Sequence, residues 1–350
     1  MEYLRDLRYC IIAIKEMKIK MKNLEKIDGL IGKTPLAKID YSYQGREGTL
    51  YAKLEYYNLS GSVKDRMAWY ILKKSYEQGL IKEGDTIVEA TSGNTGIAFC
   101  ALGAYTGNPV IIFMPDWMSQ ERKKLISSFG AKIINVSKEE GGFLGSIDLA
   151  DNYQKDHDHV FLPHQFSNPL NTQGQYESLG KELVADLERN GLVCDGFVAG
   201  VGTGGVITGV AKAIKEVNKG AKAFPLEPKE SPTLSTGYKV GSHKIAGISD
   251  EFIPDLVKGK DLDDIVSVYS NDAILMAQKL ARRGLGVGIS SGANFLGAIL
   301  AAEILGQDKV VATIFSDDNK KYLSTDLMKD IPVEEDFISK DIEILDIQAI

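Results

Sequence analysis

Short apolar runs rich in β-branched residues alternate with helical patterns along most of this chain. Five of these runs are predicted to be strands, namely residues 86–90, 110–115, 131–136, 197–201 and 310–316, with amphipathic segments between them. Residues 110–114 are apolar throughout, which is typical of a parallel strand that is buried on both faces. The alternation therefore predicts an α/β fold with mostly parallel sheets flanked by helices.

Length and composition narrow the possible organisation and partners. A chain of 350 residues exceeds what one hydrophobic core usually serves, so two domains are expected. The net charge of −7 gives no excess of positive charge that would attract nucleic acid or an anionic membrane surface. No run of about 18 apolar residues occurs, so no membrane-spanning segment is expected. Three widely separated cysteines form no disulfide framework, and a reducing cytoplasm fits this pattern.

The two ends of the chain differ from its middle. Residues 1–20 contain a short apolar run at 10–14 that is followed at once by lysines, without a small-residue cleavage site. We interpret this stretch as an N-terminal extension. After Leu327 the sequence becomes acidic and irregular, so residues 329–350 are expected to form an acidic C-terminal tail.

The first of three informative loops covers residues 58–66, where small residues lead into a helical pattern that begins near Val63. Lys64 would therefore lie at the start of a helix, where a cation is disfavoured, and such a lysine suits Schiff-base chemistry. A solvated surface lysine would explain the segment equally well when it is taken alone.

The second loop, residues 91–96, is rich in hydroxyl groups and glycine and joins the strand at 86–90 to a helix at 97–104. Free backbone amides and hydroxyls at a helix start form an anion site that suits a carboxylate or a phosphate. A plain capping turn remains the alternative at this point.

The third loop, residues 200–205, follows the strand at 197–201 and precedes a helix that runs to about Val217. It satisfies the pattern GxGxxG, and Glu227 lies about 20 residues further on, so a dinucleotide site is one possible interpretation. That interpretation leaves the other two loops without a role, whereas a phosphate cup for a smaller cofactor explains all three. The four histidines have no second ligand at useful spacing, so no metal site is predicted.

Taken together, the loops and further motifs resemble the cysteine synthase and cystathionine β-synthase family, whose enzymes depend on pyridoxal phosphate (PLP). The resemblance extends from about Ile27 to Leu327. Besides the three loops it includes residues 31–36, 114–122, 165–169, 227–232, 288–292 and 321–325. It implies two α/β domains with PLP in the cleft between them, usually assembled as a homodimer.

The resemblance also implies domain boundaries and residue roles. Residues 21–57 and 169–328 would form the larger, PLP-binding domain, and residues 58–168 the smaller, substrate-side domain. Lys64 resembles the Schiff-base lysine and general base, Asn94 the partner of the cofactor's ring hydroxyl, and Ser290 the partner of the pyridine nitrogen. The phosphate cup would consist of Gly202, Thr203, Gly204, Gly205 and Val206. The substrate site would include Thr91, Ser92, Asn94, Thr95, Gln165 and Ser249.

Two departures from the family pattern bear on the reaction. Val206 stands where the family usually has a threonine beside the phosphate, so one hydroxyl is lost. Residues 247–252 replace a glycine-rich loop that faces the substrate in cysteine synthases. Cystathionine enzymes also carry an acid at the position of Glu251, but Asp250 has no such precedent. Asp250 is therefore a candidate general base.

Several functions remain in competition. Elimination of sulfide from L-cysteine, followed by addition of water or a thiol, is favoured because water needs a protein base, whereas sulfide at neutral pH does not. The alternative enzyme is an O-acetylserine sulfhydrylase, which makes cysteine from O-acetylserine and sulfide. A non-catalytic binding scaffold on the same fold and a dinucleotide enzyme are the remaining alternatives.

Overall fold

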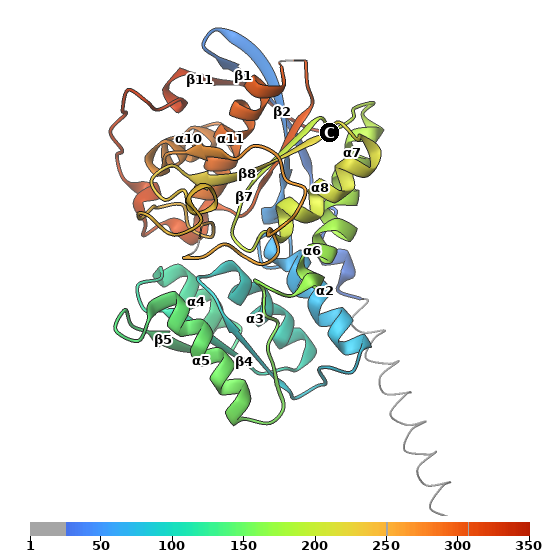
Figure 1. The fold of residues 1–350 in the computed structure, drawn as a ribbon, viewed down its shortest axis with the longest axis vertical. Coiled ribbons are helices and arrows are strands. Elements are labelled where there is room, and N and C mark those ends of the chain that lie inside the picture. Colours follow the sequence, from blue (N-terminus) through green and yellow to red (C-terminus); the bar gives the residue numbers. More distant parts are fainter. Residues whose placement is uncertain (1–25, 250, 307) are drawn as a thin grey trace, which may run out of the picture.

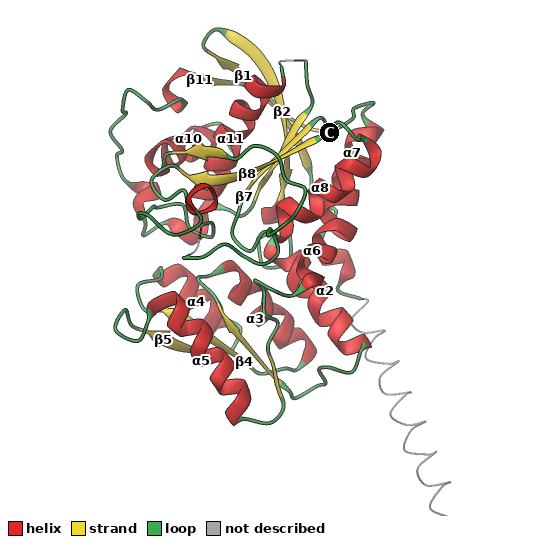
Figure 2. Cartoon of the chain, in the orientation of Figure 1, coloured by secondary structure: helices red, strands yellow, loops and turns green. Residues whose placement is uncertain are grey.

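The computed structural model describes residues 26–249, 251–306 and 308–350. The predicted N-terminal extension and Asp250 lie outside the described residues. Figure 1 shows two lobes, and each lobe contains one sheet. The α/β architecture with helix-flanked, mostly parallel sheets is confirmed, and helices cover both sheets (Figure 2).

The larger lobe is built on a seven-stranded sheet of order β11-β1-β2-β10-β7-β8-β9. From β2 to β9 neighbouring strands are parallel, whereas β1 pairs antiparallel with both β2 and β11. Its strands are β1 (Leu36–Tyr43), β2 (Arg46–Leu54), β7 (Gly196–Gly200), β8 (Lys222–Pro228), β9 (Val266–Val268), β10 (Val311–Phe315) and β11 (Ile342–Ala349).

The smaller lobe is built on a four-stranded parallel sheet of order β5-β4-β3-β6. Its strands are β3 (Thr86–Ala90), β4 (Val110–Pro115), β5 (Lys132–Val136) and β6 (Val160–Phe161). The five predicted strands are present and correspond to β3, β4, β5, β7 and β10, with ends that differ by one residue at most.

The helices cover the two faces of each sheet. They are α2 (Lys64–Glu77), α3 (Asn94–Thr106), α4 (Gln120–Ser128), α5 (Gly142–Asp156), α6 (Pro169–Gln175), α7 (Lys181–Arg189), α8 (Gly205–Val217), α9 (Thr233–Thr236), α10 (Ser270–Arg282) and α11 (Ile289–Leu305). In the small lobe, Ile87 of β3 packs with α2, α3 and α4, while its neighbour Val88 packs with α5. This division follows from the two-residue period of a strand.

The same division organises the large lobe. Val198 of β7 belongs to a core with α10 and α11, whereas Phe197 and Ala199 belong to a core with α7 and α8. Because the strands are buried on both faces, their sequences read as continuous apolar runs. None of the helices in the described part of the chain is long and apolar enough to cross a membrane.

The expected irregular tail is not what the structure shows. Residues 342–349 form β11, which pairs with β1 at the edge of the large sheet and buries Ile342 and Ile344 in its core. Over residues 342–344 apolar and acidic residues alternate, so Ile342 and Ile344 are buried while Glu343 faces solvent. The acidic residues of this segment led to the prediction of an irregular tail, although the alternation at residues 342–344 is typical of a strand.

A buried ion cluster fixes the start of α2 to the large lobe. The Nε of Arg66 lies 2.6 Å from Oε2 of Glu55, and its Nη1 lies 2.9 Å from Oε2 of Glu182. The side chains of Arg66 and Glu55 are fully buried, so each charge needs this compensation. The cluster holds the preceding lysine loop in place.

Candidate functional site

The lysine loop is held against the end of β10. The amide of Val63 donates to the carbonyl of Ser316 at 2.9 Å, and the amide of Ser60 donates to the buried carboxylate of Asp65 at 3.0 Å. Lys64 is the first residue of α2, one position after the predicted start. Lys64 shares a pocket with Ser316, just after β10, and with Gly200, the last residue of β7. Open α/β sheets bind ligands at these carboxyl ends of parallel strands.

The second loop joins β3 to α3, which begins at Asn94, three residues earlier than predicted. The hydroxyl of Thr95 donates to Oε1 of Gln165 at 2.6 Å, and Nε2 of Gln165 donates to the carbonyl of Ala90 at 2.8 Å. Residues 70 positions apart in sequence are thereby joined, and the Gln165 side chain is fixed beside the start of α3.

Glu89 lies behind this wall and is buried. Its carboxylate oxygens accept from the amide of Ala90 at 3.0 Å and from that of Gln165 at 3.4 Å. Burial nevertheless raises the pKa of Glu89 to about 8, because two amide donors do not replace the lost hydration of the anion. The carboxyl is therefore mostly neutral at pH 7.

The third loop leads from β7 into α8, as predicted. A Cβ atom on Gly202 would lie 2.3 Å from the carbonyl oxygen of Gly247, so only glycine fits there. The hydroxyl of Thr203 accepts from Nδ2 of Asn171 at 3.0 Å, and that amide group also donates to the carbonyl of Gln165. The second and third loops are thus connected through Asn171.

Asp317, at the end of β10, connects two further site residues. Its Oδ2 accepts from Nδ2 of Asn94 at 2.7 Å and from the hydroxyl of Tyr322 at 2.6 Å. Burial and the neighbouring Asp317 carboxylate raise the pKa of Tyr322, so the phenol remains a donor. Because the carboxylate requires a donor, the amide nitrogen of Asn94 faces Asp317 and its oxygen faces the other way.

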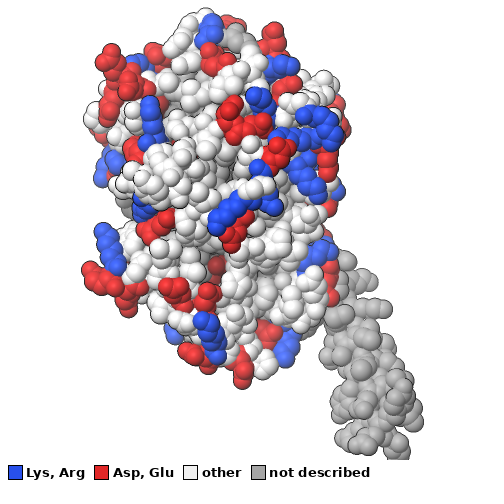
Figure 3. All heavy atoms as spheres, in the orientation of Figure 1, with Lys and Arg blue, Asp and Glu red and all other residues white. Residues whose placement is uncertain are grey.

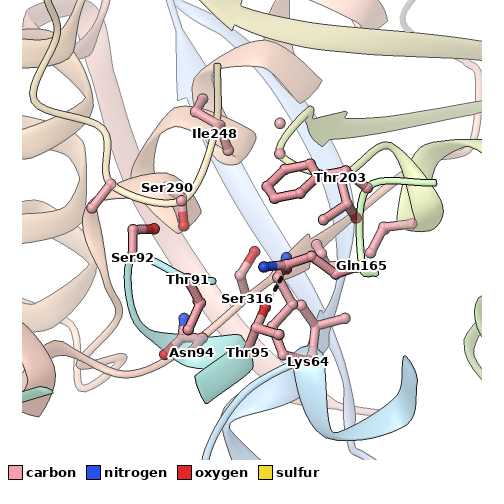
Figure 4. A pocket seen from close by; sticks show the side chains of 18 of the residues that line it. Lys64, Thr91, Ser92, Asn94, Thr95, Gln165, Thr203, Ile248, Ser290 and Ser316 are labelled. Atoms are coloured by element: carbon pink, nitrogen blue, oxygen red, sulfur yellow. Dashed lines mark hydrogen bonds between the residues drawn. The ribbon is translucent and has the colours of Figure 1, made fainter. Parts of the chain in front are cut away.

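One pocket between the lobes collects most of the predicted residues (Figure 4). Its walls include Lys64, Thr91, Ser92, Asn94, Thr95, Gln165, Gly202, Thr203, Val206 and Ser290. Gly204 and Gly205 form the start of α8 and do not line the pocket among the described residues. Ser249 lines an adjoining outer groove together with Glu251.

The pocket residues fit a phosphorylated cofactor that binds a lysine. A lysine, a glycine loop at a helix start and a serine at the start of α11 meet in one cavity. Oδ1 of Asn94 is buried and has no hydrogen-bond partner among the described residues. Such a buried polar atom indicates a position for a ligand, since native proteins rarely leave one unsatisfied. A lysine for a Schiff base and a glycine loop at a helix start for a phosphate are features that suit PLP.

Comparison with known proteins agrees with this geometry. The model of the family described as "Pyridoxal-phosphate dependent enzyme" matches residues 27–317. The cysteine synthase of Staphylococcus aureus is 39% identical over 307 residues, which cover 87% of this chain and 97% of the relative. The chain belongs to the cysteine synthase family of PLP-dependent enzymes. PLP is therefore its cofactor, and the dinucleotide and scaffold interpretations are wrong for this family member.

Solved structures of this family are similar over nearly the whole chain. A hydrogen sulfide-producing enzyme from Fusobacterium nucleatum is 58% identical, with a TM-score of 0.91 over 94% of this chain and 99% of that one. An aspartate-to-asparagine mutant of that enzyme, in complex with an α-aminoacrylate intermediate, is 57% identical. Its TM-score is 0.92 over 94% of this chain and 100% of the mutant.

Three polar or charged residues of the site were missed as individual candidates from the sequence. Arg122 and Ser316 line the pocket, and Asp317 orders Asn94 beneath it. Ser316 is the last residue of a predicted parallel strand and Asp317 follows it, and polar residues at that end of a strand are a usable signal. Arg122 offered no such signal, because its contacts come from distant parts of the chain.

The described residues contain no group of three or more His, Cys, Asp or Glu side chains that could hold a metal ion. Figure 3 shows Lys and Arg side chains interspersed with Asp and Glu on the visible face. That face presents no continuous basic surface.

Proposed function

We propose that this family member eliminates sulfide from L-cysteine and then adds water, giving L-serine, or a thiol in place of water. The observation that carries the proposal is an acidic loop at the mouth of the pocket, in a chain 58% identical to a hydrogen sulfide-producing enzyme. Asp250 is outside the described residues, but its neighbours Ser249 and Glu251 both line the outer groove.

We assign roles in the first half-reaction to residues of the pocket. Bound PLP would supply an electron-accepting ring conjugated to the substrate nitrogen. Lys64 would hold the cofactor through Nζ and then take the Cα proton of the substrate. Ser290 would face the pyridine nitrogen, Asn94 the ring hydroxyl, and the loop of Gly202 and Thr203 the phosphate.

The substrate carboxylate would bind at the start of α3. The loop of Thr91 and Ser92 ends at a helix N-terminus, where free amides favour an anion. Gln165 would complete this site, because its side chain is already fixed by Thr95 and by the carbonyl of Ala90. A carboxylate bound there would present the substrate's Cβ toward the outer groove.

The second half-reaction needs a base for water, and we propose Asp250. The other acid of the loop, Glu251, is already engaged in an ion pair with Lys239 at 2.7 Å. A positioned general base typically contributes about 10²–10⁴-fold to such a step. In the similar enzyme, an aspartate-to-asparagine mutant holds an α-aminoacrylate intermediate, which is consistent with an aspartate acting after elimination.

The decisive experiment follows both products of L-cysteine with the purified holoenzyme. The wild type should release sulfide and form serine in equal amounts. Asp250→Asn should release about one sulfide per site in a burst, while serine formation slows by about 10²-fold or more. Glu251→Gln is the matched control and should change serine formation much less. Serine formation by Asp250→Asn at the wild-type rate would refute the role of Asp250.

Synthesis of cysteine from O-acetylserine and sulfide is the alternative function. It is supported by relatives such as the Staphylococcus aureus cysteine synthase, at 39% identity. A wild-type holoenzyme that converts O-acetylserine and sulfide rapidly, but releases no sulfide from L-cysteine, would establish this alternative.

We also propose that the chain forms a homodimer, as the family resemblance implies. Light scattering should then give about twice the chain mass of 38.3 kDa. A single-chain mass at micromolar concentration would contradict this proposal.

A further inference from the structure

Arg122 is a buried cation at the wall of the active-site pocket. The residue lies in the first turn of α4 and is 6% exposed. Among the described residues, no carboxylate oxygen lies within 4.0 Å of its guanidinium, whereas the buried Arg66 is paired with two glutamates. A buried charge without a counter-ion is costly, so such a group is expected to meet an anion at some stage of the reaction.

The described contacts of this guanidinium are with neutral groups. Its Nη1 donates to the carbonyl of Ser92 at 3.2 Å, and its Cζ lies over the ring of Tyr322, 5.0 Å from the centroid. Its Nε is buried and has no hydrogen-bond partner among the described residues. A Cβ on Gly93 would lie 2.7 Å from this Nε, so the guanidinium lies directly against the loop proposed to bind the substrate carboxylate.

Arg122 also lies where the pocket meets the outer groove, because it lines both cavities. The other cations of the groove are already compensated: Lys239 pairs with Glu251 at 2.7 Å, and Lys244 with Asp326 at 2.9 Å. Burial lowers the pKa of His243, which favours the neutral imidazole at pH 7. Of the described cations that line the outer groove, Arg122 is therefore the one without a described carboxylate within ion-pair distance.

We propose that Arg122 forms a subsite for the hydrosulfide anion as it leaves Cβ of the substrate. This proposal rests on the proposed function. Lys64 Nζ takes the Cα proton, the Cα–H electron pair forms the Cα=Cβ bond, and the Cβ–S bond breaks with its electron pair going to sulfur. The product carries a full negative charge on sulfur, and a fixed guanidinium beside it stabilises that charge as it develops. The groove then leads the anion to solvent.

The test compares two leaving groups on the same carbon skeleton, using holoenzymes. Chloride is a much weaker base than hydrosulfide, so its departure from 3-chloro-L-alanine needs less electrostatic help. In Arg122→Met, kcat for sulfide release from L-cysteine should fall about 100-fold, the usual effect of losing one such donor. The kcat for chloride release should fall less than about fivefold, and the KM for each amino acid should change little.

A merely structural role predicts a different result. If Arg122 only braces the loop against Tyr322, Arg122→Met should slow both substrates by the same factor, and this outcome would overturn the proposal. Lys124→Met is the matched control, because it removes an exposed cation from the same helix. It should leave both rates unchanged. Retention of PLP absorbance and of the melting temperature would show that Arg122→Met is folded.

Failure of the proposed function gives a separate signature. If the wild type releases no sulfide from L-cysteine but makes cysteine from O-acetylserine, the reaction runs in the other direction and sulfide becomes a substrate. The subsite then predicts that Arg122→Met raises the KM for sodium hydrosulfide at least tenfold, without a matching rise for O-acetylserine. An unchanged KM for hydrosulfide would overturn the subsite.

Discussion

Glu89 offers a direct test of how burial acts on the substrate-side wall. Its carboxyl is buried beneath Gln165, and its pKa of about 8 in the folded protein compares with 4.5 for a solvated glutamate. Between these values the unfolded chain has released the proton while the folded chain retains it. The free energy of unfolding therefore falls as pH rises through this window, by about 1.36 kcal/mol per pH unit from this group.

Glu89→Gln removes this titration while keeping the shape of the side chain. The amide cannot accept at both of its terminal atoms, so the variant should lose about 0.5–1.5 kcal/mol at every pH through one hydrogen bond. The loss of the Glu89 titration changes the free energy of unfolding in the opposite direction, and this contribution depends on pH. From about pH 5.5 to pH 7.5, the variant should gain roughly 2–3 kcal/mol relative to the wild type.

Urea unfolding of both holoenzymes, followed by tryptophan fluorescence at the two pH values, measures this difference. Groups other than Glu89 titrate in both proteins and cancel in the comparison. Glu139→Gln removes an exposed carboxyl and should show no such pH-dependent gain. If the difference between Glu89→Gln and wild type is the same at both pH values, Glu89 is ionised in the folded protein and the reasoning from burial is refuted.

Three further substitutions test the proposed cofactor site. Lys64→Ala should abolish sulfide release while the melting temperature and circular dichroism change little; a variant with normal release would remove Lys64 from its role. Gly204→Asp should expel PLP, measured by visible absorbance, because its Cβ would lie 2.3 Å from Cγ1 of Val257, at a φ of 85°, and its carboxylate would add a negative charge beside the proposed phosphate loop; Gly204→Ala shares the contact and the strain without the charge and should retain more cofactor. Val206→Thr should add one hydrogen bond of about 0.5–1.5 kcal/mol and tighten PLP binding in equilibrium dialysis, and unchanged binding would mean that the side chain does not reach the phosphate.

The central parallel strands and the loops that follow them could be predicted from local pattern. Strands β3, β4, β5, β7 and β10 are apolar runs of the right length, and two glycine-rich loops follow β3 and β7 directly. Such features depend on residues close in sequence, so the period of hydrophobicity and the turn residues are sufficient to find them. The motifs spaced along the chain likewise indicated the family and PLP.

Contacts between distant residues could be seen only in the folded chain. β11 is an edge strand because Ile342 and Ile344 find the core beside β1, about 300 residues away in sequence. The pKa of Glu89 depends on how completely the surrounding lobe excludes water, which its own strand does not reveal. In the sequence, nothing distinguishes Arg122 from the other basic residues of its helix. Its position between Ser92 and Tyr322, without a described counter-ion, arises because three segments meet at one wall, and no local pattern encodes such a meeting.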